Sequence, residues 1–445
     1  MFFYLSFIRP PPTKAPVNNT LLITPQIAND LRTESCTTDH ELFYDWVRVE
    51  DGADIQTRAA VHARRASAKK PTMTKLTTWK AANAYKEVPV PLPPSVREGQ
   101  MYKLVLAAVP IGPVGPNASA PANTLPPSTG RILLDDERLG RWHPLSVSSM
   151  PVLFTYQSRG APKQEEIERT YEFRITGADA EASASANLTL EEISTQLKGL
   201  QLEVPKDCAP GKSRDVRLVI REQTSFDLDK KIWDSGIGMS AWLVQWLNRR
   251  FPAPRAAQKG NVAVGEAATR LKDILNSPDA INVLELGAGV GIVALVLAAL
   301  RSRLANADDK ILTTDLESAL PLLNHTIEFN ASAISPRISV KTGVLDWDES
   351  LAEQLPEQES FDLVVMADVA YNHDSFSSLV KILSGLQTMD PAKRPCFVLG
   401  YKERDAAERT LWELTEAVGI KFVQIGSVPG HAAGDAPVEI WVAQS

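Results

Sequence analysis

The chain has 445 residues, which is enough for two or three domains. Hydrophobic residues make up 44% and charged residues 23%, as in ordinary globular proteins. The net charge of −7 argues against a broad basic surface, and we expect no nucleic-acid partner. No run approaches the roughly 20 apolar residues of a membrane span. The three cysteines are far apart and show neither a disulfide nor a metal-ligand pattern, so we expect no metal site and a location in the cytoplasm, with the nucleus as the alternative.

The first half of the chain is rich in proline, with 21 of the 31 prolines in residues 1–210. The apolar start has no basic residue before it, which predicts a strand and not a signal peptide. Further strands are predicted at Met101–Val109, Pro151–Tyr156 and Tyr171–Ile175, and a helix from Asn187 to about Leu200. We therefore predict a Pro-rich, partly disordered extension over 1–130 and an accessory module over 131–210.

From about residue 211, strands alternate with helices of 10–15 residues. This pattern predicts an α/β fold with a Rossmann-like, doubly wound sheet of seven mostly parallel strands. A preceding strand is expected at Val216–Glu222. The sheet strands are expected at Ile281–Leu286, Ile311–Thr314, Ile338–Thr342, Phe361–Met366, Cys396–Leu399, Lys421–Ile425 and Val438–Val442. The helices are expected at Met239–Arg250, Val290–Leu300, Glu317–Asn330, Ser375–Gln387 and Asp405–Val418. No helix separates the last two strands, so we expect them to form an antiparallel hairpin.

A glycine-rich turn follows the first buried strand, in the sequence Val-Leu-Glu-Leu-Gly-Ala-Gly-Val-Gly that ends at Gly291. Glycine allows a tight turn and lets a ligand approach the backbone closely. The dinucleotide pattern requires a third glycine or alanine where this chain has Ile292, so the spacing disfavours a dinucleotide. Glu285 lies two residues before Gly287, where an acid suits a positively charged ligand better than a pyrophosphate.

A second acid, Asp315, is predicted at the end of the next strand, 24 residues beyond Gly291. A carboxylate there can accept hydrogen bonds from the two hydroxyls of a ribose. The alternative is that Asp315 caps the helix expected to begin near Glu317. The glycine turn and this acid together favour S-adenosylmethionine, which carries a sulfonium, an ammonium and a ribose.

Residues from about 215 to the end resemble the seven-stranded protein methyltransferases of the nicotinamide-methyltransferase-like family. The resemblance includes the glycine turn, with Glu285, Gly287 and Gly289, and the acid Asp315. It also depends on three further stretches. They are Ile-Trp-Asp-Ser-Gly at 232–236, Val-Leu-Asp-Trp at 344–347 and Met-Ala-Asp-Val-Ala-Tyr at 366–371. It implies that the cofactor contacts Trp233, Asp346, Trp347 and Ala367, and that Asp368 and Tyr371 are catalytic. A weaker match covers Glu403 and Arg404, for which a place at the substrate entrance and a surface salt bridge are equally expected.

The resemblance implies an N-methyltransferase that uses S-adenosylmethionine and acts on a lysine of a non-histone protein, such as a translation factor or a chaperone-type ATPase. The Asp-Val-Ala-Tyr motif lacks the paired prolines of enzymes that methylate adenine or glutamine amides, but leaves histidine and an N-terminal amine open. A small-molecule methyltransferase, a nicotinamide-dependent oxidoreductase and a non-catalytic scaffold that binds the cofactor stay open as well. We expect a monomer.

Overall fold

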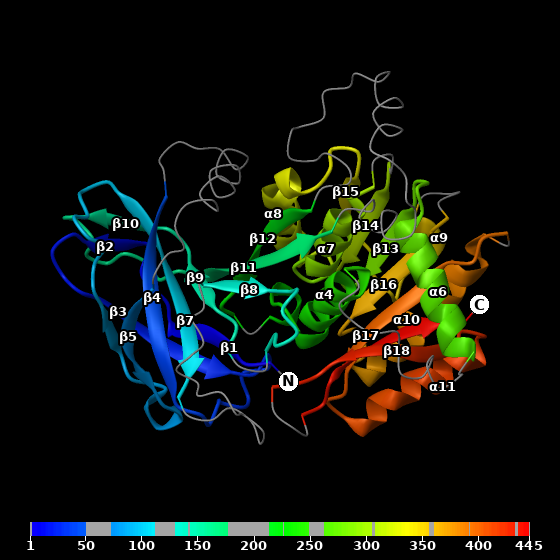
Figure 1. Cartoon of the computed structure of the whole chain (residues 1–445), viewed down its shortest axis with the longest axis horizontal. Coiled ribbons are helices and arrows are strands. Elements are labelled where there is room, and N and C mark those ends of the chain that lie inside the picture. The colour runs from blue at the N-terminus through cyan, green and yellow to red at the C-terminus, as the bar shows by residue number, and fades with distance from the viewer. Residues whose placement is uncertain are drawn as a thin grey trace, which may run out of the picture.

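The computed structural model describes residues 2–49, 73–111, 130–140, 143–176, 213–225, 227–248, 262–304, 308–355, 360–390, 392–431 and 435–444. The helix predicted from Asn187 to Leu200 lies outside these residues. Two units stand side by side in Figure 1, with strands of the first half on the left and an α/β unit on the right. No helix among the described residues is both long enough and apolar enough to cross a membrane.

The α/β unit is built on a seven-stranded sheet in the order β15-β14-β13-β16-β17-β19-β18. Every neighbouring pair is parallel except those that β19 makes, so the predicted Rossmann-like sheet and its antiparallel hairpin are confirmed. The strands are β13 (Asn282–Leu286), β14 (Lys310–Asp315), β15 (Ser339–Val344), β16 (Leu363–Ala367), β17 (Cys396–Lys402), β18 (Phe422–Val428) and β19 (Val438–Ala443). The carboxyl ends of its parallel strands form one edge, where ligands bind in such sheets.

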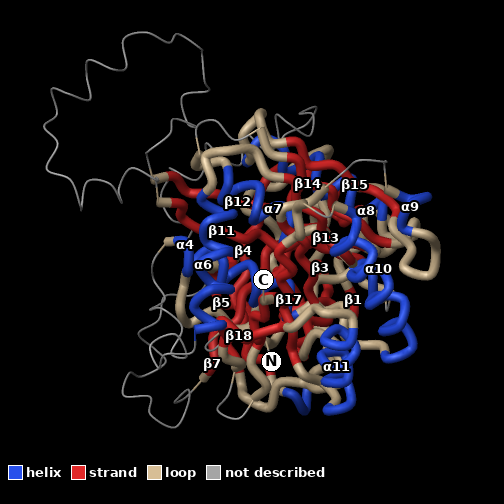
Figure 2. The backbone as a smooth tube through the Cα atoms, turned by 90° about the vertical axis from the view of Figure 1, so that its right-hand side faces the viewer, coloured by secondary structure: helices blue, strands red, loops and turns tan. Residues whose placement is uncertain are grey.

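Helices cover both faces of this sheet because its strands are apolar on both sides. One face packs on α4 (Asp234–Leu247), α6 (Val262–Asn276), α7 (Ile292–Arg301) and α8 (Leu320–Asn330). The other packs on α9 (Leu351–Gln354), α10 (Phe376–Met389) and α11 (Thr410–Ala417). Figure 2 shows α4 and α6 on one side of the strands and α10 and α11 on the other. The sequence prediction did not include α6.

The first half of the chain contains more regular structure than the Pro-rich, partly disordered extension that we predicted. Its described residues form a nine-stranded sheet and a three-stranded sheet of order β1-β3-β6. The strands are β1 (Tyr4–Arg9), β2 (Lys14–Pro16), β3 (Leu21–Ala28), β4 (His40–Val49), β5 (Thr74–Trp79), β6 (Val88–Val90), β7 (Met101–Pro110), β8 (Arg131–Leu133), β9 (Val147–Ser149), β10 (Val152–Thr155), β11 (Glu166–Ile175) and β12 (Arg214–Gln223). Prolines lie where a strand tolerates them: Pro16 and Pro110 end strands, Pro89 lies in an edge strand, and Pro25 pairs beside a register shift.

Strand β12 follows the boundary that we predicted at residue 211, but it lies in the N-terminal sheet. This strand pairs with β11 over ten residues and so completes the N-terminal sheet, not the seven-stranded sheet. Helix α4 then lies between the two units, and 13 of its 14 residues are buried. A single apolar cluster includes Tyr171 and Leu218 of the N-terminal sheet together with Trp242 of α4 and Val365 of β16. The two units therefore share one core.

Candidate functional site

The glycine turn leaves β13 in a backbone conformation that only glycine adopts easily. Gly287, Gly289 and Gly291 have φ values of +64°, +55° and +79°. A Cβ on Gly287 would lie 2.9 Å from the Cγ1 atom of Val369, and one on Gly291 would lie 2.5 Å from the Cδ1 atom of Leu323. Helix α7 begins directly after Gly291. The turn therefore presents bare backbone at the carboxyl edge of the sheet.

Two acids flank this turn, as the sequence predicts. Glu285 is buried and accepts a hydrogen bond of 2.5 Å from the Thr313 hydroxyl, and burial raises the pKa of Glu285 to about 7. Asp315 ends β14 and accepts from the backbone N–H of Gly289 at 2.6 Å and of Leu316 at 2.7 Å. Burial raises its pKa as well. One partner, Gly289, lies in the glycine turn, and the other, Leu316, lies before α8, so Asp315 does not cap that helix.

The loop after β15 brings an aromatic ring to the same place. The Trp347 ring lies 3.5 Å from where a Cβ of Gly287 would be. Gln354 holds the loop by accepting from the Asp346 N–H at 2.6 Å and donating to the Asp346 carbonyl at 2.8 Å. The Asp346 carboxylate accepts from the N–H of Asp348. The predicted contacts of Asp346 and Trp347 with an adenine ring stay predictions, and both residues are half-buried beside the turn.

The segment after β16 carries the two residues predicted to be catalytic. Asp368 has φ +57°, a conformation rare outside glycine, and its neighbour Val369 packs against the glycine turn. Its carboxylate accepts from the Ser235 N–H at 2.5 Å and from Arg404 at 2.6 Å. Tyr371 is 54% exposed. Burial, then Asp315 and Asp229, raises the pKa of the Tyr371 phenol, which keeps the hydroxyl protonated at neutral pH.

A further segment, residues 228–235, closes the site from the side of α4. The Trp233 indole donates to the Leu228 carbonyl at 2.8 Å, and the Arg404 guanidinium lies 5.4 Å from the centre of the indole ring. The Asp229 carbonyl would lie 3.7 Å from a Cβ on Gly289. The structure thus places the backbone of this segment beside the glycine turn and the Trp233 ring beside Arg404, which bonds Asp368.

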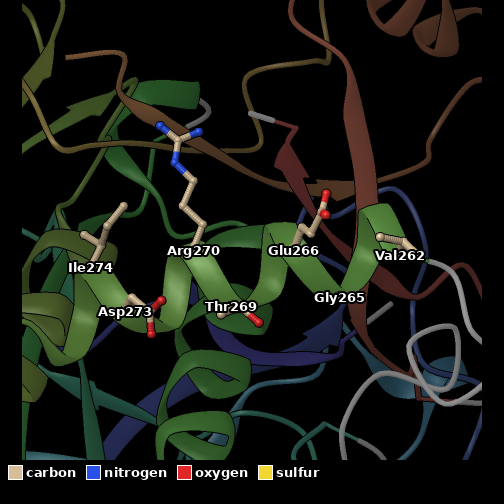
Figure 3. A pocket seen from close by; sticks show the side chains of 7 residues that line it. All are labelled: Val262, Gly265, Glu266, Thr269, Arg270, Asp273 and Ile274. Carbon is tan, nitrogen blue, oxygen red and sulfur yellow. The ribbon is translucent and has the colours of Figure 1, made fainter. Parts of the chain in front are cut away.

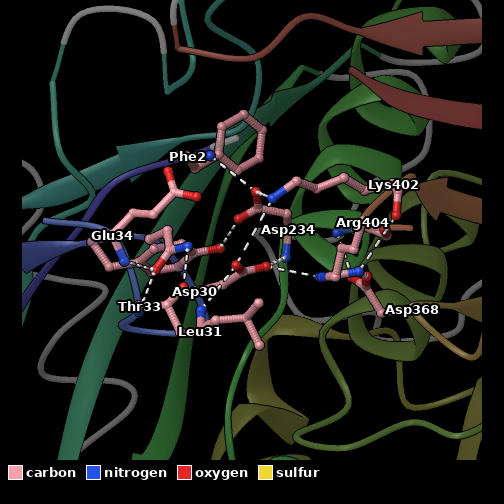
Figure 4. A network of polar contacts seen from close by, with 12 residues as sticks. Phe2, Asp30, Leu31, Thr33, Glu34, Asp234, Asp368, Lys402 and Arg404 are labelled. Atoms are coloured by element: carbon pink, nitrogen blue, oxygen red, sulfur yellow. Dashed lines mark hydrogen bonds and ion pairs between the residues drawn. The ribbon is translucent and has the colours of Figure 1, made fainter. Parts of the chain in front are cut away.

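Sequence reasoning missed the ionic network behind Asp368 (Figure 4). Arg404 bonds both Asp368 and Asp30, and Lys402 bonds Asp234 at 2.6 Å. Arg404 therefore takes part in the site, whereas its neighbour Glu403 pairs with Arg409 away from it. The signal available for Arg404 was its position directly after the fifth parallel strand. Asp30, from the turn after β3, gave no such signal.

Comparison with known proteins agrees with this geometry. Residues 212–417 match the model of a family described as lysine methyltransferase. This part of the chain is therefore similar to lysine methyltransferases. The match ends at α11, but the sheet of the α/β unit continues to β19, since β19 lies between β17 and β18. Residues 2–176 of the described chain lie before the matched region.

Three relatives are each similar to part of this chain. A UPF0665 family protein of Schizosaccharomyces pombe is 30% identical over 45% of this chain and 50% of its own length. The protein-lysine N-methyltransferase EFM6 of Saccharomyces cerevisiae is 31% identical over 28% and 52%. The protein N-lysine methyltransferase METTL21A of Danio rerio is 32% identical over 33% and 61%. The chain therefore spans about half to three fifths of the length of these relatives.

One surface hollow of the α/β unit lies away from the site. It runs along α6 and is lined by Val262, Gly265, Glu266, Thr269, Arg270, Asp273 and Ile274 (Figure 3). None of these residues belongs to the glycine turn or to the segments around it. Within the described ranges, no three His, Cys, Asp or Glu side chains come together as metal ligands.

Proposed function

We propose that this protein is a methyltransferase that uses S-adenosylmethionine to methylate a lysine amine of another protein. The observation that carries the proposal is the packing of the Asp368–Tyr371 segment against the glycine turn, with Asp315 bonded to that turn. The named activities of EFM6 and METTL21A support lysine as the acceptor. The cytoplasm, with the nucleus as the alternative, and a monomeric state belong to the same proposal.

The acceptor is identified by incubating the purified protein with a cell lysate and S-adenosylmethionine labelled in its methyl group. We expect label in one or a few proteins, and mass spectrometry of the labelled band should place it on a lysine side chain. Label on histidine or on an N-terminal amine would change the acceptor. Label confined to small molecules would contradict a protein substrate.

The residues present fit this cofactor. Bare backbone at Gly287 and Gly289 allows a close approach, and the Asp315 carboxylate at the strand end suits ribose hydroxyls. The half-buried ring of Trp347 offers a flat apolar surface for adenine. Ala367 ends β16 at the same edge, and Trp233 precedes α4 with its ring beside Arg404. When bound, the cofactor supplies an electrophilic methyl group on a sulfonium.

The chain contributes placement and charge to the reaction. A lysine amine has an ordinary pKa near ~10.4, so it must lose a proton before it can act as a nucleophile. Asp368 is held by two donors, so its carboxylate is fixed in position to orient the amine and favour loss of its proton. Tyr371 stays protonated and half exposed, so it offers an aromatic face and a hydroxyl donor to the lysine, not a base.

Cofactor binding should depend on Asp315. We expect Asp315→Ala to weaken S-adenosylhomocysteine binding by about 10–100-fold, because hydrogen bonds to a charged group contribute roughly 1.5–3 kcal/mol. Isothermal titration calorimetry measures this directly, with Asp308→Ala, an exposed acid before the same strand, as the matched control. Wild-type protein should bind S-adenosylhomocysteine and not NAD. Tight NAD binding would favour the oxidoreductase alternative.

Methyl transfer should depend on Asp368. We expect Asp368→Ala to lower the transfer rate by about 100-fold or more while S-adenosylhomocysteine affinity changes little, since general-base and positioning roles contribute on that scale. The rate is measured as label transferred to lysate protein at saturating cofactor. Asp273→Ala, an exposed acid on α6, serves as control. An undiminished rate with unchanged affinity would remove Asp368 from the mechanism.

A further inference from the structure

The Asp368 carboxylate does not hold its position through its own segment. One oxygen accepts from the Ser235 N–H and the other from Arg404. Its side chain is only 6% exposed, and its backbone has the unfavourable φ of +57°. Strained backbone of this kind persists only where neighbouring groups fix it. The position of Asp368 therefore depends on what fixes Arg404.

Arg404 is fixed by a residue of the N-terminal unit. Its Nη2 atom lies 2.8 Å from Asp30 Oδ2, while Nη1 lies 2.6 Å from Asp368 Oδ1, so one guanidinium joins two carboxylates (Figure 4). The planar guanidinium donates in fixed directions, which suits it to setting one carboxylate relative to another. The Asp30 side chain is 0% exposed. Asp30 and Arg404 are 374 residues apart in the chain.

The turn that carries Asp30 is itself held firmly. The Asn29 side-chain carbonyl accepts from the backbone N–H of Thr33 at 2.9 Å and of Glu34 at 3.1 Å. The second Asp30 oxygen accepts from the Leu31 N–H at 3.0 Å. Arg32, at φ +59°, donates to the Thr224 carbonyl at 3.0 Å. The turn thus presents Asp30 in one orientation.

A second ion pair, beside the first, ties the N-terminal unit to the methyltransferase domain. Lys402 lies 2.6 Å from Asp234 and 3.8 Å from Asp30. Asp234 also accepts from the Tyr4 hydroxyl at 2.7 Å and from the Phe2 N–H at 3.0 Å. Tyr4 therefore contacts the same interface as Asp30, but it reaches Asp234 and not Arg404.

We propose that Asp30 is a positioning residue of the methyltransferase site, which sets the Asp368 carboxylate through Arg404. The inference rests on the proposed function. The N-terminal unit then supplies part of the active-site support and is more than an attached module. Without the charge of Asp30, Arg404 keeps one carboxylate partner and its guanidinium can turn, which loosens Asp368 relative to the glycine turn.

The first test needs no methyl acceptor. Unfolding in urea is compared for wild type, Asp30→Asn, Asp368→Asn and the double variant. Either single variant leaves Arg404 one charged partner, but the double variant leaves it none. Multiplying the two single effects gives the unfolding constant expected of the double variant if the sites were independent. We expect the measured constant to exceed this product by about fivefold or more, which is within the range of coupled neighbours. A measured unfolding constant within twofold of this product would overturn the proposal.

The second test measures rate and affinity separately. We expect Asp30→Asn to lower the maximal rate of label transfer to lysate protein by about tenfold or more, because misplacement of about 1 Å is costly. S-adenosylhomocysteine affinity should stay within about threefold of wild type. Tyr4→Phe removes a buried contact of the same interface, so it controls for general loosening, and Asp215→Asn breaks the exposed pair with Arg174. Both controls should keep the wild-type rate.

An unchanged rate in Asp30→Asn, or an equal loss in Tyr4→Phe, would overturn the positioning role. If Asp30→Asn does not fold, Arg404→Lys replaces the two-armed guanidinium by a single nitrogen and should show the same loss of rate at unchanged affinity. If wild-type protein transfers no label to any lysate protein, the proposed function fails. The unfolding comparison still decides whether Asp30 and Asp368 are coupled.

Discussion

Arg404→Met is expected to lower the free energy of unfolding by about 3–5 kcal/mol, the usual cost of removing one partner from a buried ion pair. Methionine fills much of the volume but leaves two buried carboxylates, Asp30 and Asp368, with no guanidinium. Methyl transfer should fall by about 100-fold or more because Asp368 then loses one of its two donors. Urea unfolding and label transfer at a temperature where the variant stays folded measure the two effects.

Arg337→Met is the matched control. Arg337 also makes two bonds to one carboxylate, Asp308, but both side chains are exposed, at 44% and 64%. An exposed pair contributes about 0–1 kcal/mol, so this variant should be nearly as stable as wild type. Equal losses of unfolding free energy in Arg404→Met and Arg337→Met would contradict the prediction. The burial of Asp30 and Asp368 would then add nothing to the cost of losing their partner.

The free energy of unfolding is also expected to fall as the pH drops from about 6.5 to about 4. Protonation of His40 should account for about 3 kcal/mol of this fall. His40 is fully buried in β4, and burial, with smaller effects of His431 and His143, lowers its pKa to about 4. The unfolded chain binds a proton near the ordinary pKa of 6.5, but the folded chain does not until about 4. The contribution of neutral His40 to the free energy of unfolding is therefore fully present above pH 6.5 and is lost as the pH falls from 6.5 to 4.

The ring geometry explains why folded His40 resists protonation. Its Nδ1 atom lies 2.7 Å from the Thr38 carbonyl. A carbonyl can only accept a hydrogen bond, so Nδ1 carries the proton. The other nitrogen, Nε2, has no hydrogen-bond partner among the described residues. His40→Asn keeps an amide donor for Thr38 and should flatten the stability curve between pH 6.5 and 4 in urea unfolding. The exposed His373→Gln is the control. A curve for His40→Asn as steep as that of wild type would contradict the assignment.

The α/β unit could be predicted because its signals are local. A buried parallel strand such as β13 is a short apolar run, and a ligand residue at its end, such as Asp315, lies within a few residues of that run. Helix α6 was missed although its buried residues recur at helical spacing, at Val264, Ala267, Ala268, Leu271 and Leu275. The role of Glu285 was inferred from its position before the glycine turn, and those of Trp347 and Asp368 came from the resemblance. The structure adds the partners of Glu285 and Asp368.

Strands β1, β7, β10 and β11 of the N-terminal unit were predicted, but their assembly could not be, because it is determined by distant contacts. Prolines at strand ends, such as Pro16 and Pro110, look in sequence like those of a disordered segment. In sequence, β12 looks like the first element of the methyltransferase domain, and only its ladder with β11 assigns it to the other sheet. Asp30 is one acid in a polar turn, and nothing near it in sequence indicates that its partner is Arg404.

The long separation between Asp30 and Arg404 has a consequence for how the site is assembled during synthesis. The turn with Asp30 leaves the ribosome early, whereas β17 and Arg404 emerge hundreds of residues later. The glycine turn can form once β13 and α7 exist, but Asp368 is locked only after Arg404 reaches Asp30. A nascent chain would therefore complete the glycine turn before the contacts that hold the Asp368 carboxylate.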